Sequence, residues 1–314
     1  MSELQVRGYR CEDQGAVMDV WNAALPYDTI DASTFQRKVL LDPNFDAEWL
    51  LVADSGTQVV GFCLCLIRRL PTSDLDMEPG RGWITSMGVL PCQQGCGVGS
   101  ALLERAVELF AGQKRAQIDV APYTPNYFVP GVDTERYARG LEFLQTRGFE
   151  RLADAVSMDA NIVLLRDGDW LSKQAALVQR GFLVRSMRSE EMPALGAFLK
   201  AHMPADWVRH GRELMVDVTR GLAGLDQFTL AFRGDDIVGF CLFEGEHFGP
   251  FGVREDMQGQ GIGTVMLANC LMAMRARGHH NAWVLWTGDR AAEHVYSRFG
   301  FTTTRRFAVL RRRL

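Results

Sequence analysis

The chain has 314 residues, of which 47% are hydrophobic and 23% are charged, and its formal net charge is −4 at pH 7. This composition is that of an ordinary globular protein, and the negative balance argues against non-specific nucleic-acid binding. No apolar run approaches the ~18 residues of a membrane span, and the first residues lack a signal-peptide pattern, so neither is expected.

Hydrophobic periodicity predicts a similar order of elements twice. In the first half we expect helices at 12–25, 32–41, 98–112 and 134–147, and strands at 49–53, 59–67, 83–89 and 118–121. In the second half we expect helices at 189–202, 209–223, 262–277 and 290–298, and strands at 228–233, 237–244, 248–253, 282–286 and within 301–310. The predicted domains are 1–160 and 181–314, joined by a connecting segment at 161–180 that has the pattern of a strand end and a helix.

Cysteine and histidine usage adds two constraints. The seven cysteines are scattered without a C-x-x-C pair, which predicts neither a disulfide framework nor a metal site and favours a reducing, cytoplasmic environment. All six histidines follow residue 201, so the first half has no imidazole to offer catalysis.

Three short landmarks recur in the same order. The segment 59–64 (VVGFCL) returns 178 residues later as IVGFCL, and the loop 94–99 (QGCGVG) returns 164 residues later as QGQGIG. The pair Gly148-Phe149 returns 152 residues later as Gly300-Phe301. Offsets that drift while the order is kept indicate a duplicated domain with altered loop lengths. The first half is longer by 14 residues between the first two landmarks and by 12 between the last two.

Each glycine-rich loop runs directly into an amphipathic helix. Closely spaced glycines let backbone N–H groups converge on an anion, and the helix N-terminus adds its partial positive charge. A pyrophosphate is the ligand that such a loop suits. The dinucleotide-binding spacing G-x-G-x-x-G is absent from both loops, which argues against a nicotinamide or flavin fold.

The order of strand, Q-x-x-G-x-G loop, helix, strand and short helix ending in Gly-Phe resembles the GNAT superfamily of acyl-CoA-dependent N-acyltransferases, once in each half. The resemblance implies an α+β fold of two tandem GNAT-like domains. Each would be a mixed, mostly antiparallel twisted sheet, flanked by helices and splayed between its fourth and fifth strands. Acetyl-CoA, or a related acyl-CoA, would lie in that opening, with its pantetheine along the strand edges 86–89 and 250–253. The implied cofactor-binding residues are Val89, Gln94, Gly95, Gly97, Gly99 and Ser100, and in the second half Val253, Gln258, Gly259, Gly261, Gly263 and Thr264.

The resemblance also implies a catalytic acid. Tyr296 lies four residues before Gly300, where members of the family often carry a tyrosine that protonates the CoA sulfur. Packing on the sheet is the alternative role for this ring. Its counterpart in the first half is Leu144, so the resemblance favours catalysis in the second half.

Candidate bases lie around the turn between the predicted strands 237–244 and 248–253. Glu244 and His247 are the candidates, although with Glu246 they suit a polar turn equally well.

The first half has its own candidate acids. They are Tyr123, Tyr127 and Tyr137, in or beside the additional segment 123–133. That segment is alternatively a rigid aromatic loop that shapes the site.

The sequence therefore predicts an acetyltransferase that moves an acetyl group from acetyl-CoA to a primary amine of a small molecule, by direct attack in a ternary complex and without a metal. Three alternatives stay open. One is a CoA-binding module in which the N-terminal domain is structural or regulatory. The others are an enzyme resembling mycothiol synthase and a protein N-acetyltransferase.

Overall fold

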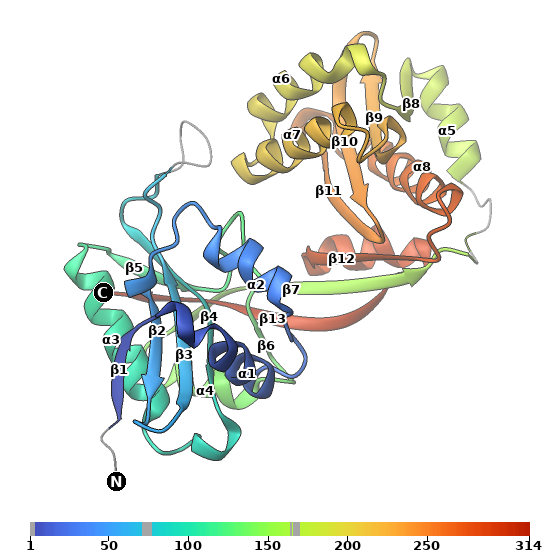
Figure 1. Ribbon diagram of the computed structural model, residues 1–314. Coiled ribbons are helices and arrows are strands. Elements are labelled where there is room, and N and C mark those ends of the chain that lie inside the picture. Colours follow the sequence, from blue (N-terminus) through green and yellow to red (C-terminus); the bar gives the residue numbers. More distant parts are fainter. Residues whose placement is uncertain (1–3, 71–76, 164, 166–169) are drawn as a thin grey trace. The chain divides into compact units, whose positions relative to one another are not determined.

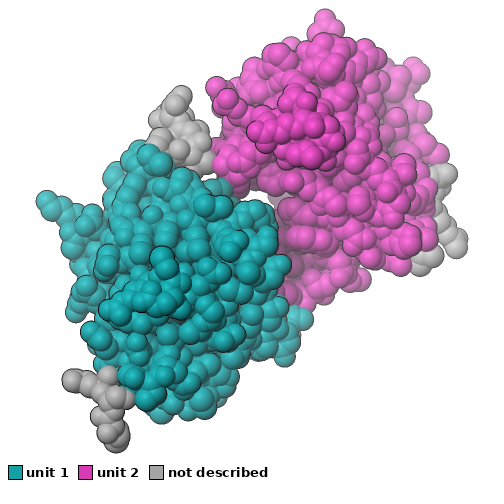
Figure 2. All heavy atoms as spheres, in the orientation of Figure 1, with its two compact units in different colours: residues 1–155, 306–314 teal, residues 156–305 magenta. Residues whose placement is uncertain are grey.

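The computed structural model describes residues 4–70, 77–163, 165 and 170–314. These residues form two compact units, one of residues 1–155 together with 306–314 and one of residues 156–305 (Figure 2). Part of the predicted connecting segment, residues 164 and 166–169, lies outside the described residues.

The first unit is a sheet with helices on both faces (Figure 1). Its strands are β1 (Gln5–Gly8), β2 (Leu50–Asp54), β3 (Val59–Leu66), β4 (Arg81–Val89), β5 (Gln117–Val120) and the short β6 (Val132–Asp133). Its helices are α1 (Gln14–Ala24), α2 (Ala32–Phe35), α3 (Val98–Gly112) and α4 (Ala138–Gln145). The strand order is β1-β2-β3-β4-β5-β13, in which β13 is the last strand of the chain (Thr302–Arg313). The pairing is antiparallel from β1 to β4 and parallel between β4 and β5.

Successive residues of β2 supply the two core layers of this unit. Leu50 and Val52 pack with α1 and α2, whereas Leu51 and Ala53 pack with α3. A strand buried on both faces reads as a continuous apolar run, which is why β2 and β3 lack a hydrophobic–polar alternation.

The second unit repeats this architecture. Its elements are α5 (Trp170–Gln179), β8 (Phe182–Ser186), α6 (Met192–His202), α7 (Ala205–Thr219), β9 (Phe228–Arg233), β10 (Asp236–Glu244), β11 (His247–Val253), α8 (Ile262–Ala276), β12 (Asn281–Thr287) and α9 (Asp289–His294). The strand order is β8-β9-β10-β11-β12-β7, in which β7 is Glu150–Asn161, and β11 and β12 are parallel. Helices α6 and α7 pack on one face and α5 and α8 on the other.

Two long strands pass from one unit to the other. They are β7 (Glu150–Asn161) and β13 (Thr302–Arg313). The end of β13 pairs with β5, in the register Leu310 to Val120, so residues 306–314 belong to the first unit. The end of β7 pairs with β12 and belongs to the second unit. This division differs from the predicted ranges 1–160 and 181–314, because the last strand of the chain completes the first sheet.

The fold confirms the predicted class. Both predicted helices after the glycine loops begin where expected, at Val98 and Ile262. The predicted element order omitted β1, β6 and β8, and of β7 it contained only a strand end near residue 161. Residues 301–310, expected as more than one strand, lie almost entirely in the single strand β13. None of the helices that the structure describes is long and apolar enough to cross a lipid bilayer.

Candidate functional site

The two glycine loops have nearly the same backbone conformation. Gly95 and Gly97 have φ of 79° and 87°, and Gly259 and Gly261 have φ of 74° and 84°. A side chain added at any of the four would meet no atom within 4 Å, so the left-handed backbone, not crowding, requires glycine here. The first N–H groups of α3 and α8 have no partner within their helices and face this open space. Each loop is therefore a ready cradle for an anion.

A glutamine braces each loop against the strand before it. The Gln94 side-chain amide donates to the Val89 carbonyl at 3.3 Å, and the Gln258 amide donates to the Val253 carbonyl at 3.0 Å. The same contact in both halves ties the end of the fourth strand to the start of the glycine loop. These two glutamines, predicted as cofactor ligands, thus also hold the shape of the cradle.

The fourth and fifth strands of each unit separate beyond a short paired stretch. Strand β4 pairs with β5 only as far as Ile84, and β11 pairs with β12 only at His247. The Leu90 N–H bonds to β3, at the Val60 carbonyl, so alternation along the strand turns the N–H groups of Met87 and Val89 toward the opening. These two groups can pair with an extended ligand.

A cavity of about 920 Å³ lies at this opening in the first unit. All six residues predicted to bind the cofactor in the first half line it, namely Val89, Gln94, Gly95, Gly97, Gly99 and Ser100. The end of α1, the segment 128–132 and helix α4 complete the lining. The volume is in the usual range for small-molecule and cofactor sites.

Arg147 is a residue of this cavity that the sequence analysis missed. Its guanidinium donates to the Ser100 hydroxyl at 2.6 Å and lies 3.8 Å from the centre of the Phe143 ring. A cation is thereby held beside the N-terminus of α3, where a phosphate would add to the helix dipole. Its position just before Gly148 was the available signal, since the second half has Phe299 there.

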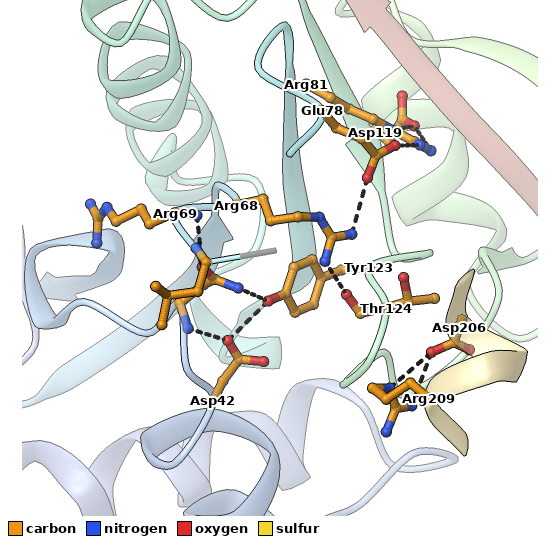
Figure 3. Close-up of polar contacts among 12 residues, drawn as sticks. Asp42, Arg68, Arg69, Glu78, Arg81, Asp119, Tyr123, Thr124, Asp206 and Arg209 are labelled. Atoms are coloured by element: carbon orange, nitrogen blue, oxygen red, sulfur yellow. Dashed lines mark hydrogen bonds and ion pairs between the residues drawn. The ribbon is translucent and has the colours of Figure 1, made fainter. Parts of the chain in front are cut away.

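The candidate tyrosines of the first half lie in different surroundings. Tyr137 lines the cavity, and its hydroxyl accepts the Tyr27 backbone N–H at 3.2 Å. Tyr123 is fully buried, donates to Asp42 and accepts from Asn44, each at 2.9 Å (Figure 3). Burial and the nearby Asp42 raise the pKa of Tyr123 above its ordinary value. Tyr123 therefore anchors the additional segment 123–133, and Tyr137 is the tyrosine of this pair that faces the cavity.

In the second unit, Tyr296 packs in the core. It is 5% exposed and lies between Phe248 and Phe301, with ring centres 6.0 and 5.4 Å away. Burial, followed by the nearby Cys241, raises its pKa, and a hydrogen bond with the Thr287 side chain partly opposes this. Its role as the catalytic acid stays a prediction.

The candidate bases of the second unit lie together at the end of β10. Glu244 pairs across the strands with His247, and the His247 ring lies 4.2 Å from the Trp283 ring. The Glu244 carboxylate also lies 2.5 Å from Nε2 of His210, on α7, which lowers the pKa of Glu244. Glu246, in contrast, accepts the Asn281 backbone N–H at 3.0 Å and belongs to the turn. His210 and Trp283 were not among the predicted site residues.

A second polar network in the first unit is structural. The fully buried Asp119 bonds to Arg81, and Glu78 bonds to both Arg81 and Arg68 (Figure 3). Asp119 also accepts from Arg311 at 2.6 Å. These ion pairs join β4, β5 and the C-terminal strand. Among the described residues, no group of three His, Cys, Asp or Glu side chains is arranged to hold a metal ion.

Two family models match the sequence. Residues 16–126 match the acetyltransferase (GNAT) family, and residues 224–303 match an acetyltransferase (GNAT) domain. None of the curated proteins that were compared matches the chain.

Several solved structures have a similar fold. A GCN5-related glucosamine N-acetyltransferase region of a fungal multi-domain GH3 β-N-acetylglucosaminidase has a TM-score of 0.80 at 20% identity, covering 99% of this chain and 38% of that one. A GCN5-related N-acetyltransferase from Sphaerobacter thermophilus has a TM-score of 0.72 at 17% identity, covering 99% and 95%. A tandem GNAT protein from the clavulanic acid biosynthesis pathway has a TM-score of 0.62 at 16% identity, covering 99% and 98%. At these identities the similarity concerns the fold, and this chain spans 38% of the first of these three proteins.

Proposed function

The chain belongs to the GNAT acetyltransferase superfamily with two of its domains in tandem, and on that premise we propose that it transfers an acetyl group from acetyl-CoA to a primary amine of a small molecule. The cavity of the first unit is the observation that carries the proposal. It brings a glycine loop, a splayed strand edge and a positioned arginine to one space of about 920 Å³. When bound, acetyl-CoA supplies an acetyl group already activated as a thioester.

The residues of the cavity suit the parts of this co-substrate. The N–H groups at the start of α3 and the Arg147 guanidinium would hold the pyrophosphate. The N–H groups of Met87 and Val89 would pair with the amides of the pantetheine, as an added strand does. The Tyr137 hydroxyl, on the α4 side of the cavity, would give a proton to the departing thiolate.

The acceptor side of the cavity supports a small molecule. Trp21, Tyr27 and Phe128 line it, and Trp21 packs against Phe128 with ring centres 4.8 Å apart. The segment that carries Phe128 is pinned through Asn126, which donates to Asp42 at 2.7 Å. A rigid aromatic wall suits a compact amine better than a protein chain.

Calorimetric titration with acetyl-CoA tests the cofactor site. Gly97→Glu places a bulky anion in the first cradle and Gly261→Glu in the second, and Gly112→Glu, at the far end of α3, is the matched control with open space around it. We expect the first-unit site to vanish in Gly97→Glu and to persist in Gly112→Glu. Binding that survives in Gly97→Glu and is lost only in Gly261→Glu would refute the assignment to the first unit.

One alternative has a specific observation in its favour. Leu144, the counterpart of the predicted acid Tyr296, is 7% exposed and part of the core, so the first unit would bind acetyl-CoA without turnover if Tyr137 does not act as the acid. Tyr137→Phe separates the two cases. Loss of kcat with unchanged affinity for acetyl-CoA supports transfer in the first unit, and an unchanged kcat supports the binding module.

A further inference from the structure

The two units differ in chemistry at one set of equivalent positions. In the first unit, Leu66 pairs with Trp83, which pairs with Asp119 on β5. In the second unit the same three pairing positions hold Glu244, His247 and Trp283. The two copies of the fold therefore carry chemically different side chains at equivalent positions, just before the fourth and fifth strands separate.

In the first unit these positions are closed. Leu66, Trp83 and the fully buried Tyr123 form a compact apolar cluster there. Tyr123 belongs to the additional segment 123–133, which has no equivalent in the second half. The segment thus contributes the ring that fills this position.

In the second unit the same positions are exposed to solvent and carry ionisable side chains. The Trp283 side chain is 40% exposed, and the side chains of Glu244 and His210 are 46% and 24% exposed. Nε2 of His210 lies 2.5 Å from a Glu244 oxygen. A carboxylate this close to one imidazole nitrogen favours the hydrogen on that nitrogen, which leaves the other nitrogen to take a proton.

The charges around this pair favour Glu244 as the positioning carboxylate and His210 as the group that takes the proton. The pKa of Glu244 is lowered chiefly by the close contact with His210, and then by the charges of His210, His247 and Arg209. Arg209 is itself held by Asp206 and Glu213. A carboxylate kept ionised is a weak base but a good partner for an ammonium ion, whereas an imidazole titrates close to neutral pH.

We propose that the second unit is a separate acyl-acceptor site in which His210, positioned by Glu244, takes the proton of a primary ammonium ion held at the Trp283 ring. The proposal rests on the acetyl-CoA chemistry proposed above. The ammonium N–H bond breaks and its proton passes to His210. The amine nitrogen then forms a bond to the thioester carbon as the carbon–sulfur bond breaks. The sulfur leaves as a thiolate and takes up the second proton, which the nitrogen loses as it becomes an amide nitrogen. The exposed indole face contributes a cation–π contact, and the Glu244 carboxylate attracts the ammonium charge.

The test isolates the second unit in the full-length chain. Gly97→Glu silences the first cradle, and CoA thiol release is followed with a panel of primary amines. In this background, His210→Gln should lower kcat/KM by about 100-fold or more. It should also flatten the rise of rate with pH. Glu244→Gln should cost about tenfold, and His280→Gln, an exposed histidine in the turn before β12, should change little.

A second measurement does not depend on turnover. Two-bond proton–nitrogen NMR correlation of the imidazoles reports which ring nitrogen carries the hydrogen. In its neutral form, His210 should carry it on Nε2, the nitrogen beside Glu244, and Glu244→Ala should remove this preference. A hydrogen on Nδ1 overturns the proposal.

The kinetic outcomes separate the two proposals. Activity in wild type with none in Gly97→Glu overturns the second acceptor site and leaves the proposed function standing. Activity in Gly97→Glu that is insensitive to His210→Gln also overturns it. Wild type that binds acetyl-CoA and acetylates no amine refutes the proposed function and this inference together.

Discussion

Replacing Arg147 with alanine is expected to weaken acetyl-CoA binding by five- to thirty-fold. A hydrogen bond between a charged group and a phosphate contributes about 1.5–3 kcal/mol. Without ligand, Arg147 already donates to the Ser100 hydroxyl at 2.6 Å, a contact with a neutral group that is given up on binding. That contact has one charged partner instead of two and offsets only part of this gain, so the net loss is about 1–2 kcal/mol, or about five- to thirty-fold in Kd.

Isothermal titration of full-length protein with acetyl-CoA at two salt concentrations measures this effect. Arg147→Lys keeps the charge but loses the planar fork, so it should fall between wild type and alanine. Arg105→Ala, on the exposed face of the same α3 helix, is the control and should leave Kd unchanged. An unchanged Kd in Arg147→Ala would refute the assignment of Arg147 to the phosphate site.

Three further substitutions test the buried polar groups that support the two sites. Asp119→Asn removes the buried charge that holds Arg81 and Arg311, both of which are partly exposed. It should lower the free energy of unfolding of the first unit by about 2–4 kcal/mol, measured by urea unfolding. The control Asp154→Asn, at the surface, should cost under about 0.5 kcal/mol, and equal effects of the two substitutions would contradict the structural role of Asp119. Tyr123→Phe leaves the buried side chains of Asp42 and Asn44 each without one hydrogen-bond partner. It should lower the free energy of unfolding by about 1–3 kcal/mol without weakening acetyl-CoA binding. Weaker binding would mean that Tyr123 contacts the ligand. Burial raises the pKa of Tyr296, so its contribution to stability is complete below pH 10 and is lost as the pH rises further. Tyr296→Phe should therefore flatten the fall in melting temperature between pH 9 and 11, and an unaltered slope would show that the hydroxyl is accessible to solvent.

Features carried by neighbouring residues could be predicted from the sequence. The glycine loops need only their own left-handed backbone and the helix that follows, so their cradle shape was predictable at Gly97 and Gly261. The duplication was equally visible, because its landmarks are short and local. The splayed sheet came from the resemblance of these landmarks to a family, and the structure confirms it.

Contacts between distant residues could not be predicted in this way. The pairing of Arg147 with Ser100 joins the end of α4 to the start of α3, and the pairing of His210 with Glu244 joins a helix to a strand end. Neither pair has a sequence spacing that local periodicity can reveal. Tyr296 has the position of a catalytic tyrosine in the sequence, but only the packed core shows how far its ring is buried.

The sequence by itself determined that this chain holds two copies of one anion-cradling domain, because turn and helix chemistry act over a few residues. The tertiary structure decided which strands complete each copy. Residues 306–314 join the first unit because Leu310 pairs with Val120 and Arg311 bonds to the buried Asp119. It also decided that one set of equivalent positions is an apolar cluster in the first unit and an open imidazole–carboxylate pair in the second. Burial and long-range pairing depend on the whole packed fold, and no short stretch of sequence specifies them.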